Sequence, residues 1–249
     1  MIVGIIPARY TSTRFPGKPL IDLEGQTMLE RVWRAACAAL VFDRVVIATD
    51  SEHIVVEAQR IRAEVVLTSP DEPSGTDRCY AAIRAMKISP DIIVNIQGDE
   101  PLLQPNVLKH CVEALRSAGA DVATPVKRIS DVLDLTNPNV VKVALAASGR
   151  ALYFSRSPIP HQRGVDVAQW LAAREYWKHI GLYAYTAAAL TQHVMLPPSP
   201  LERTEHLEQL RLLGQGAYFT CVEVEHDALS VDTPEDADRV RAILRADLA

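Results

Sequence analysis

The chain has 249 residues, of which 48% are hydrophobic, and its formal net charge is -5. A chain of this length buries one substantial core, so the composition is typical of a soluble globular protein. The negative net charge and the absence of a Lys/Arg run argue against nucleic-acid or membrane-surface binding and favour small-molecule partners.

Targeting and redox features point to the cytoplasm. The first eight residues are apolar but do not form a signal peptide, and no later apolar run reaches the roughly 18 residues of a membrane span. The four cysteines are widely spaced without a CxxC pair, which indicates neither a disulfide framework nor a structural zinc site. We therefore expect a cytoplasmic protein.

Strand-like and helix-like segments alternate through the first half of the chain. Short runs rich in Val and Ile predict buried parallel strands over residues 2–6, 45–48, 65–67, 92–96 and 122–126. Apolar residues at three- and four-residue spacing predict helices over 29–40, 52–62, 77–87 and 106–118. This alternation predicts a doubly wound α/β fold with a mostly parallel sheet.

The pattern changes from about Ala151 onward. A segment punctuated by prolines is followed by a predicted strand over 179–185, a helix over 200–213 and a final helix after Pro234. No repeat or low-complexity linker divides the chain. We predict one domain over residues 1–249, with an inserted flap over about 151–215.

The turn after the first predicted strand is strongly cationic. In doubly wound sheets the ligand lies beyond the carboxyl ends of the strands, and here that position holds Arg9, Arg14 and Lys18 within ten residues, with Pro16 among them and Pro7 and Pro19 on either side. The turn has neither the GxGxxG pattern of dinucleotide sites nor a complete Walker A motif. A rigid cationic loop is suited to polyphosphate, and the alternative is a solvated basic loop.

The segment PARYTSTRFPGKPL over residues 7–20 resembles the PAR-x-x-S-x-R-x-P-x-K-P-L signature of CMP-sugar synthetases. Further segments resemble, in the same order, the branch of that family that acts on 3-deoxy-D-manno-octulosonate (Kdo): SGTDR at 74–78, NIQGDEP at 95–101, ALYFSRSPIP at 151–160 and VDTPED at 231–236. The resemblance extends over nearly the whole chain. It implies an α/β nucleotidyltransferase, usually dimeric, that joins CTP and Kdo to give CMP-Kdo and pyrophosphate for lipopolysaccharide synthesis.

Two carboxylates are candidate magnesium ligands. Asp99 follows a buried strand at its carboxyl end, where a carboxylate can bind Mg²⁺ together with triphosphate oxygens. The resemblance implies that Asp232 meets it at the metal, whereas the residues alone leave Asp232 open as a helix cap before Pro234. We nominate no general base.

The resemblance also assigns the nucleotide and the sugar acid. It places Ala8 and Arg9 near the cytosine, Ser74, Gly75 and Gln97 near the base or ribose, and Arg14 and Lys18 on the phosphates. It assigns Arg156 to the sugar carboxylate and His179, Tyr183, Glu208 and Gln209 to the rest of the sugar. Structural alternatives stay open: a surface amide for Gln97, a hydrogen-bonded structural group for His179 and a solvated helix face for Glu208 and Gln209.

A few positions depart from the family pattern. Gln26-Thr27 replaces Lys-Pro at the loop exit, and His161 stands where an aromatic residue is common. Asp77 replaces a frequent Glu, which leaves open the 8-amino analogue of Kdo as substrate. A non-catalytic nucleotide-sugar-binding protein would have lost a carboxylate or a cation, and a glycosyltransferase would carry a DxD motif after a strand. The DxD at 236–238 instead lies in a predicted helix.

Overall fold

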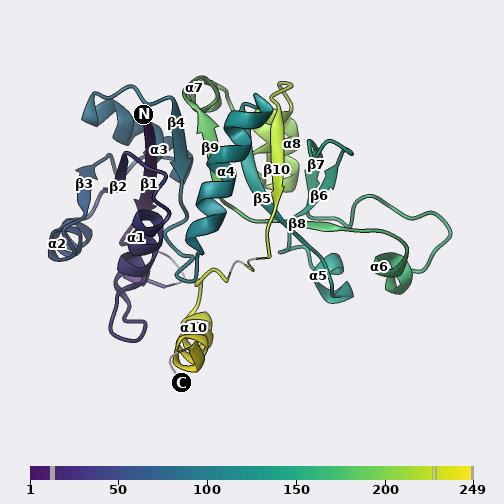
Figure 1. Cartoon of the computed structure of the whole chain (residues 1–249), viewed down its shortest axis with the longest axis horizontal. Helices are drawn as coiled ribbons and strands as arrows, with labels where there is room; N and C mark the ends of the chain where they lie inside the picture. The colour runs from purple at the N-terminus through teal and green to yellow at the C-terminus, as the bar shows by residue number, and fades with distance from the viewer. Residues whose placement is uncertain (12–14, 226, 228, 248–249) are drawn as a thin grey trace. The chain divides into compact units, whose positions relative to one another are not determined.

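A computed structural model describes residues 1–11, 15–225, 227 and 229–247 (Figure 1). The chain forms two compact units, Met1–Lys109 with Ala228–Ala249, and His110–Asp227. The second unit contains the whole region of the predicted flap, 151–215. A single domain over residues 1–249 stays a prediction.

The first unit is built on a parallel sheet with the strand order β3-β2-β1-β4. The interior of β1 is apolar on both faces, and Val3, Ile5 and Ile6 are completely buried. The predicted strands and helices are confirmed to within a few residues: β1 (Ile2–Ala8), α1 (Met28–Ala38), β2 (Arg44–Thr49), α2 (Glu52–Arg60), β3 (Glu64–Leu67), α3 (Gly75–Met86), β4 (Ile92–Asn95) and α10 (Pro234–Asp247). A short 3-10 helix, η1 (Lys18–Leu20), was not predicted. Helix α4 (Pro105–Ala118) begins in this unit and ends in the second.

The second unit adds a mixed sheet. Strand β5 pairs in parallel with β10 and antiparallel with β8 and β9, and β6 pairs antiparallel with β7 and β8. The elements are β5 (Val122–Arg128), α5 (Val132–Thr136), β6 (Lys142–Leu145), β7 (Ala151–Ser155), η2 (Val167–Gln169), α6 (Trp170–Ala173), β8 (Trp177–His179), β9 (Tyr183–Thr186), α7 (Ala187–Met195), α8 (Pro200–Glu205), α9 (Leu210–Leu213) and β10 (Phe219–Glu223). The α/β fold class is confirmed, with antiparallel strands in this unit.

The strand predicted over 179–185 is two strands, β8 and β9, so the prediction of one continuous strand is wrong. Both strands pair with β5, where His179 lies opposite Val126 and Ala184 lies opposite Ala123. Between these two pairs the segment 179–185 has two more residues than β5 has. The cause is Pro125, which has no N–H to donate to the ladder. The Thr124 hydroxyl instead contacts the freed carbonyls of Ile180 and Leu182. Because two residues are one full period of a strand, the side chains keep their predicted faces.

The helix predicted over 200–213 is also two helices, and that prediction is wrong too. Helix α8 begins with a capping box between Ser199 and Glu202, as its sequence indicates, and ends at His206. His206 has a φ of 51°, in the left-handed region that stops a helix. The backbone carbonyl groups of Glu205 and His206 are taken by Arg156, which compensates the interrupted helix ladder.

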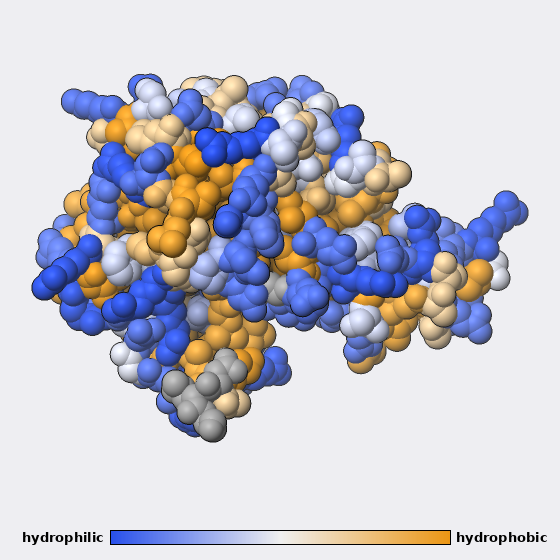
Figure 2. Space-filling view, viewed as in Figure 1, coloured by the Kyte–Doolittle hydropathy of each residue, from blue (hydrophilic) through white to orange (hydrophobic). Residues whose placement is uncertain are grey.

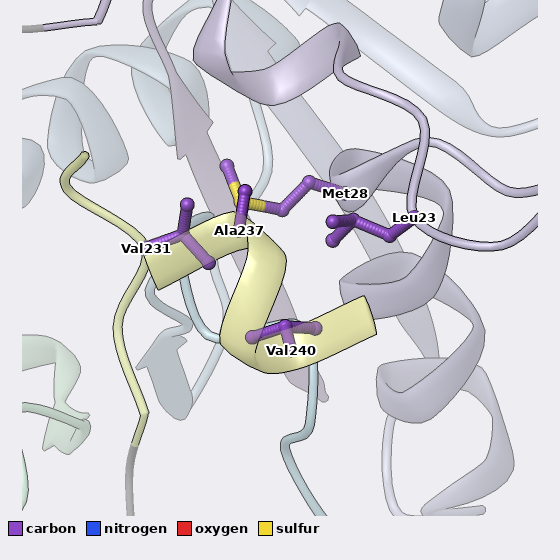
Figure 3. Close-up of a cluster of buried hydrophobic side chains, with 5 residues drawn as sticks. All are labelled: Leu23, Met28, Val231, Ala237 and Val240. Carbon is purple, nitrogen blue, oxygen red and sulfur yellow. The ribbon is translucent and has the colours of Figure 1, made fainter. Parts of the chain in front are cut away.

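A buried apolar cluster docks α10 in the first unit (Figure 3). Leu23 and Met28, from the segment after β1, pack with Val231, Ala237 and Val240, and all five side chains are 0% exposed. A backbone bond of 2.9 Å from the Val231 N–H to the Asp99 carbonyl adds a fixed point. These contacts hold the start of α10 beside the end of β4.

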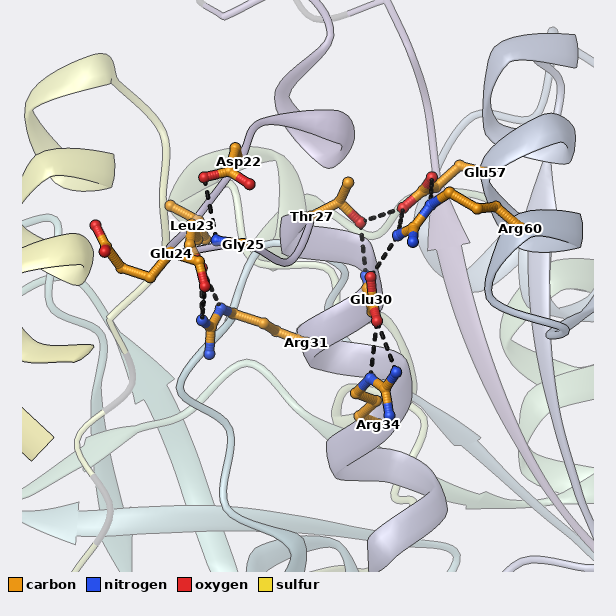
Figure 4. A network of polar contacts seen from close by, with 10 residues as sticks. All are labelled: Asp22, Leu23, Glu24, Gly25, Thr27, Glu30, Arg31, Arg34, Glu57 and Arg60. Atoms are coloured by element: carbon orange, nitrogen blue, oxygen red, sulfur yellow. Dashed lines mark hydrogen bonds and ion pairs between the residues drawn. The ribbon is translucent and has the colours of Figure 1, made fainter. Parts of the chain in front are cut away.

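A charged network fixes the start of α1 (Figure 4). The Thr27 hydroxyl accepts the Glu30 N–H as the helix N-cap and donates to the Glu57 carboxylate at 2.5 Å. Arg60 bonds to Glu30 and Glu57, and Arg34 bonds to Glu30. Thr27, one of the departures from the family pattern, therefore supplies both a cap and a partner for a buried carboxylate.

We expect this network to make stability fall in acid. Hydrogen bonds from Arg60 lower the pKa of Glu57 against the effect of burial, and Arg60 and Arg34 lower the pKa of Glu30 although burial opposes them. Their stabilisation is complete above the ordinary pKa of 4.5 and is lost as the pH falls through the lower folded-state values. Urea unfolding at pH 7 and pH 4 measures it.

Glu57→Gln should lower the free energy of unfolding at pH 7 and reduce its difference between the two pH values. Glu64→Gln, which removes an exposed ion pair with Arg44, is the matched control and should leave that difference unchanged. Equal pH dependence in wild type and Glu57→Gln would show that the network does not titrate as described.

On the face of the molecule that Figure 2 shows, hydrophilic residues alternate with patches of apolar residues. Within the described chain, no helix combines the length and the apolar character needed to cross a membrane.

Candidate active site

A cleft of about 450 Å³ opens in the first unit at the carboxyl ends of β1 and β4. This volume is within the range of small-molecule sites. The cleft is lined by the turn after β1, the start of α3, the turn after β4 and the start of α10: Pro7, Ala8, Arg9, Thr11, Lys18, Pro19, Met28, Gly75, Arg78, Gln97, Gly98, Asp99 and Asp232. The cleft is therefore where a doubly wound sheet is expected to bind its ligand.

Two glycines allow these turns to approach each other closely. A Cβ added to Gly98 would lie 3.0 Å from the Pro7 carbonyl oxygen, and one added to Gly75 would lie 3.3 Å from the Pro7 side chain. Any larger residue would push the β4 turn or the start of α3 away from β1. The glycines thus bring Gln97 and Asp99 to the edge of the cationic turn.

Lys18, Asp99 and Asp232 meet at one point, although they lie far apart in the sequence. The Lys18 ammonium donates to the Asp99 carboxylate at 2.9 Å and to the Asp232 carboxylate at 3.1 Å. Burial works against the charged amine, but the two carboxylates outweigh it and raise the pKa of Lys18. Lys18 is therefore a fixed cation at neutral pH, at the end of the cleft where Asp99 and Asp232 lie.

Asp232 is not the cap of α10. Thr233 caps this helix through its side chain, which accepts the Asp236 N–H at 3.3 Å, and the Asp236 carboxylate accepts the Thr233 N–H at 3.0 Å. This reciprocal pair is a capping box with Pro234 at the first helical position. The Asp232 carboxylate is thereby directed to Lys18 instead of the helix end.

The donor set fits a magnesium ion bound together with a substrate. Two carboxylates from different turns bond to the same ammonium, so their oxygens lie within reach of one small cation. Within the described residues, no group of three or more His, Cys, Asp or Glu side chains is arranged to hold a metal. Mg²⁺ commonly takes one or two carboxylates and completes its shell with phosphate oxygens and water, whereas a structural zinc site requires four protein ligands.

Of the remaining nucleotide candidates, some line the cleft and one caps a helix. Ala8, Arg9 and Gln97 line the cleft, and Arg9 donates to the Glu72 carbonyl. Ser74 caps α3 by accepting the N–H groups of Thr76 and Asp77, and its hydroxyl donates to the Asp77 carboxylate at 2.7 Å. Arg14 lies outside the described residues. The departure at Asp77 is thus part of the α3 cap.

Two residues of this region were not among the candidates from the sequence. Arg78 is completely buried and lines the cleft, where it bonds to Asp50 at 3.1 Å and to Thr68. Burial raises the pKa of Glu100 to about 8, and repulsion from Asp99 adds to the effect. Glu100 is therefore mainly protonated at neutral pH and adds little negative charge beside Asp99. Both belong to the quoted segments SGTDR and NIQGDEP, which were the available signal.

Four of the sugar candidates form a polar cluster in the second unit. The His179 and Tyr183 rings lie 5.3 Å apart, and the Tyr183 hydroxyl donates to the Gln209 side-chain carbonyl at 3.0 Å. Burial lowers the pKa of His179 to about 3, so the ring is neutral. Burial, together with the charge of Glu208, raises the pKa of Tyr183, which keeps its hydroxyl protonated. The cluster thus offers neutral donors beside one carboxylate.

The cluster contains a buried donor without a partner. Gln209 is 4% exposed, and its side-chain nitrogen has no hydrogen-bond partner within the described chain. An unpaired buried N–H is costly and is usually satisfied by a ligand or water. The solvated-face alternative is therefore wrong for Gln209, whereas the Glu208 side chain is 33% exposed.

Arg156 is held by the main chain. Its guanidinium donates to the carbonyls of Glu205 at 2.7 Å, Pro138 at 3.0 Å and His206 at 3.3 Å. Three of its five N–H groups are used in this way, which fixes the plane of the guanidinium and leaves donors for an anion. The nearby Lys142 ammonium donates to two further carbonyls.

Together, the fold and the cation-carboxylate cleft define an α/β protein built to bind a nucleotide polyphosphate. Residues 3–223 match the model of the cytidylyltransferase family. A 3-deoxy-manno-octulosonate cytidylyltransferase from Cytophaga hutchinsonii is 44% identical over 240 residues, which are 96% of each chain. One from Chlorobium limicola is 45% identical over 246 residues, 98% of this chain and 97% of the relative. The chain belongs to the cytidylyltransferase family, among the 3-deoxy-manno-octulosonate cytidylyltransferases.

Solved structures agree with this assignment. A CMP:2-keto-3-deoxy-manno-octonic acid synthetase complexed with CTP superposes with a TM-score of 0.92 at 36% identity and covers 99% of both chains. A cytidylyltransferase from Leptospira borgpetersenii, 19% identical with a TM-score of 0.64, shares the fold. The fold class is therefore that of the nucleotide-diphospho-sugar transferases.

Proposed function

We propose that this chain transfers the cytidylyl group of CTP to the anomeric hydroxyl of Kdo and releases pyrophosphate. The observation that carries the proposal is the meeting of Lys18, Asp99 and Asp232 in the cleft of a chain whose relatives are named for this reaction. A protein that only binds a nucleotide sugar does not require a cation held by two carboxylates in its nucleotide cleft, because it stabilises no charge that develops during a reaction. The same three residues therefore argue for an enzyme.

In the first unit, the residues of the cleft bind CTP. Lys18, with Arg14 by family resemblance, places positive charge where the non-bridging and leaving oxygens of the triphosphate gain negative charge during transfer, and Arg9 lines the cleft beside Ala8, where the resemblance places the cytosine. The amide of Gln97 and the main chain around Ala8 offer the donors and acceptors that a cytosine edge requires. Ser74 and Gly75 shape the start of α3 beside them.

Asp99 and Asp232 are the residues that would hold Mg²⁺. When bound, the ion supplies Lewis-acid stabilisation of charge on the α-phosphate. Lys18 bonds to both carboxylates and keeps their side chains pointing into the cleft.

In the second unit, the polar cluster binds the sugar acid. The planar guanidinium of Arg156 suits the carboxylate of Kdo, since it offers paired donors that a lysine lacks. The Tyr183 ring and the neutral His179 face the sugar, and Glu208 and Gln209 exchange hydrogen bonds with its hydroxyls. The unpaired side-chain nitrogen of Gln209 supports this role.

The enzyme is further proposed to act as a homodimer in the cytoplasm and to supply CMP-Kdo for lipopolysaccharide synthesis. Exposed apolar side chains of the second unit support a protein interface: Leu133 is 70% exposed and Leu152 is 58% exposed. CTP is an intracellular metabolite, which supports the compartment.

The proposal is tested by incubating the protein with CTP, Mg²⁺ and one sugar acid at a time. Kdo, its 8-amino analogue and sialic acid are compared at equal concentration by the rate of pyrophosphate release. We expect Kdo to give the highest rate. The Asp77 carboxylate accepts a hydrogen bond from the Ser74 hydroxyl in the α3 cap, so this departure from the family pattern is explained without a different sugar substrate. A higher rate with 8-amino-Kdo would reassign the substrate, and no release with any of the three would refute the proposal.

A further inference from the structure

A buried histidine in the second unit holds the Glu208 carboxylate. His193 lies on α7 with its side chain completely buried, and its Nε2 is 2.7 Å from the Glu208 Oε1. The Glu208 side chain is 33% exposed. A group inside the unit is thus bonded to a carboxylate that reaches the surface.

The position of the His193 ring is fixed from several sides. The Tyr185 ring lies 6.3 Å away, at an angle of 53°. Arg211 on α9 donates to the His193 backbone carbonyl at 3.2 Å, and the same guanidinium bonds to Glu202 of the α8 capping box at 2.6 Å. Since α7, α8 and α9 are joined through one arginine, the imidazole has little freedom to turn away from Glu208.

The hydrogen-bond chemistry defines the tautomer. An ionised carboxylate only accepts hydrogen bonds, so His193 carries its hydrogen on Nε2 and donates to Glu208. His193 Nδ1 has no hydrogen-bond partner among the described residues. When the ring carries a single hydrogen, Nδ1 is an acceptor and the ring N–H is used for Glu208.

We propose that His193 is a positioning residue that orients Glu208 for the hydroxyls of the sugar acid. This inference rests on the proposed function, in which Glu208 accepts hydrogen bonds from Kdo. A charge-assisted hydrogen bond holds one carboxylate oxygen and directs the other. His193 does not line the nucleotide cleft, whose residues all belong to the first unit. Its removal therefore weakens sugar binding selectively.

Two substitutions of similar chemistry separate positioning from stability. The amide nitrogen of His193→Gln reaches the place of Nε2, whereas the amide of His193→Asn overlays Nδ1 and is too short to reach Glu208. We expect His193→Asn to raise the KM for Kdo roughly tenfold and to leave the KM for CTP within about twofold. His193→Gln should restore the KM for Kdo to within about threefold of wild type.

Glu208→Gln provides the coupling control. In that background the Asn and Gln variants should have the same KM for Kdo, because the charged acceptor is gone. A wild-type enzyme that is active with Kdo, but whose Asn and Gln variants have equal KM values, would overturn the positioning role alone. A wild-type enzyme that releases no pyrophosphate with Kdo would overturn the proposed function and this inference with it.

A second measurement does not depend on folding of the variants. In wild-type protein with ¹⁵N-labelled histidine, addition of Kdo should shift the Nε2 resonance of His193, whereas CTP alone should shift it less. A His193 resonance that does not respond to a saturating concentration of Kdo would contradict the proposal.

Discussion

Asp99→Asn is expected to reduce kcat by roughly a thousandfold or more while the protein still unfolds cooperatively. Asparagine keeps the shape of the side chain and one oxygen but removes the negative charge that would hold Mg²⁺. It also leaves Asp232 as the carboxylate partner of Lys18 within the described residues. Steady-state pyrophosphate release at saturating CTP and Kdo measures the loss, and thermal unfolding confirms the fold.

Two further aspartates are compared with Asp99: Asp232 as the second proposed ligand and Asp236 as a control. Asp232→Asn should resemble Asp99→Asn, because both carboxylates bond to the same ammonium. Asp236→Asn, four residues further on, weakens the capping box of α10 and should cost about 1 kcal/mol of stability with kcat little changed. An Asp99→Asn enzyme of nearly wild-type kcat would disprove the ligand role.

Lys18→Met is the second change with a large expected effect. Methionine keeps much of the length of the side chain but removes the cation from between Asp99 and Asp232. Because prepositioned charge stabilises the transition state of phosphoryl transfer more than the ground state, we expect kcat to fall roughly 10²- to 10³-fold. Single-turnover measurements with excess enzyme would locate the loss in the transfer step.

Lys18→Arg tests whether charge alone is enough. Arginine keeps the charge but spreads it over a planar guanidinium, which cannot place one compact donor group between two carboxylates as the ammonium of Lys18 does. We expect an activity between wild type and Lys18→Met. If Lys18→Met were as active as Lys18→Arg, Lys18 would be a structural link between the turns and not a source of charge for the reaction.

Local periodicity predicted most of the first unit. The apolar runs that become β1 to β4 have no polar face, and the helices between them carry their apolar residues on one side, so each element was readable from its own residues. The turns after β1 and β4 follow from the rule for doubly wound sheets. The meeting of Lys18 with Asp232 does not, because it depends on the packing of α10 against Leu23 and Met28 and on the backbone bond from Val231 to Asp99.

Tertiary context decided the places where the prediction failed. Pro125 interrupts the partner strand and splits the segment 179–185, although the signal was visible in β5 and not in the segment itself. The helix break at His206 lacks a glycine and depends on Arg156 taking the freed carbonyls from a distant strand end. Likewise, nothing in the spacing of His193 and Glu208 indicates their contact, which depends on where α7 packs.

The central claim is most directly tested by the identity of the products. Phosphorus NMR of a reaction with CTP, Kdo and Mg²⁺ should show one pyrophosphate formed for each CTP consumed, together with a phosphodiester in which CMP is joined to the sugar. The phosphodiester should be absent when Kdo is omitted and when Asp99 is replaced by asparagine. Consumption of CTP to CDP and inorganic phosphate, or to free CMP without a sugar phosphodiester, would contradict cytidylyl transfer.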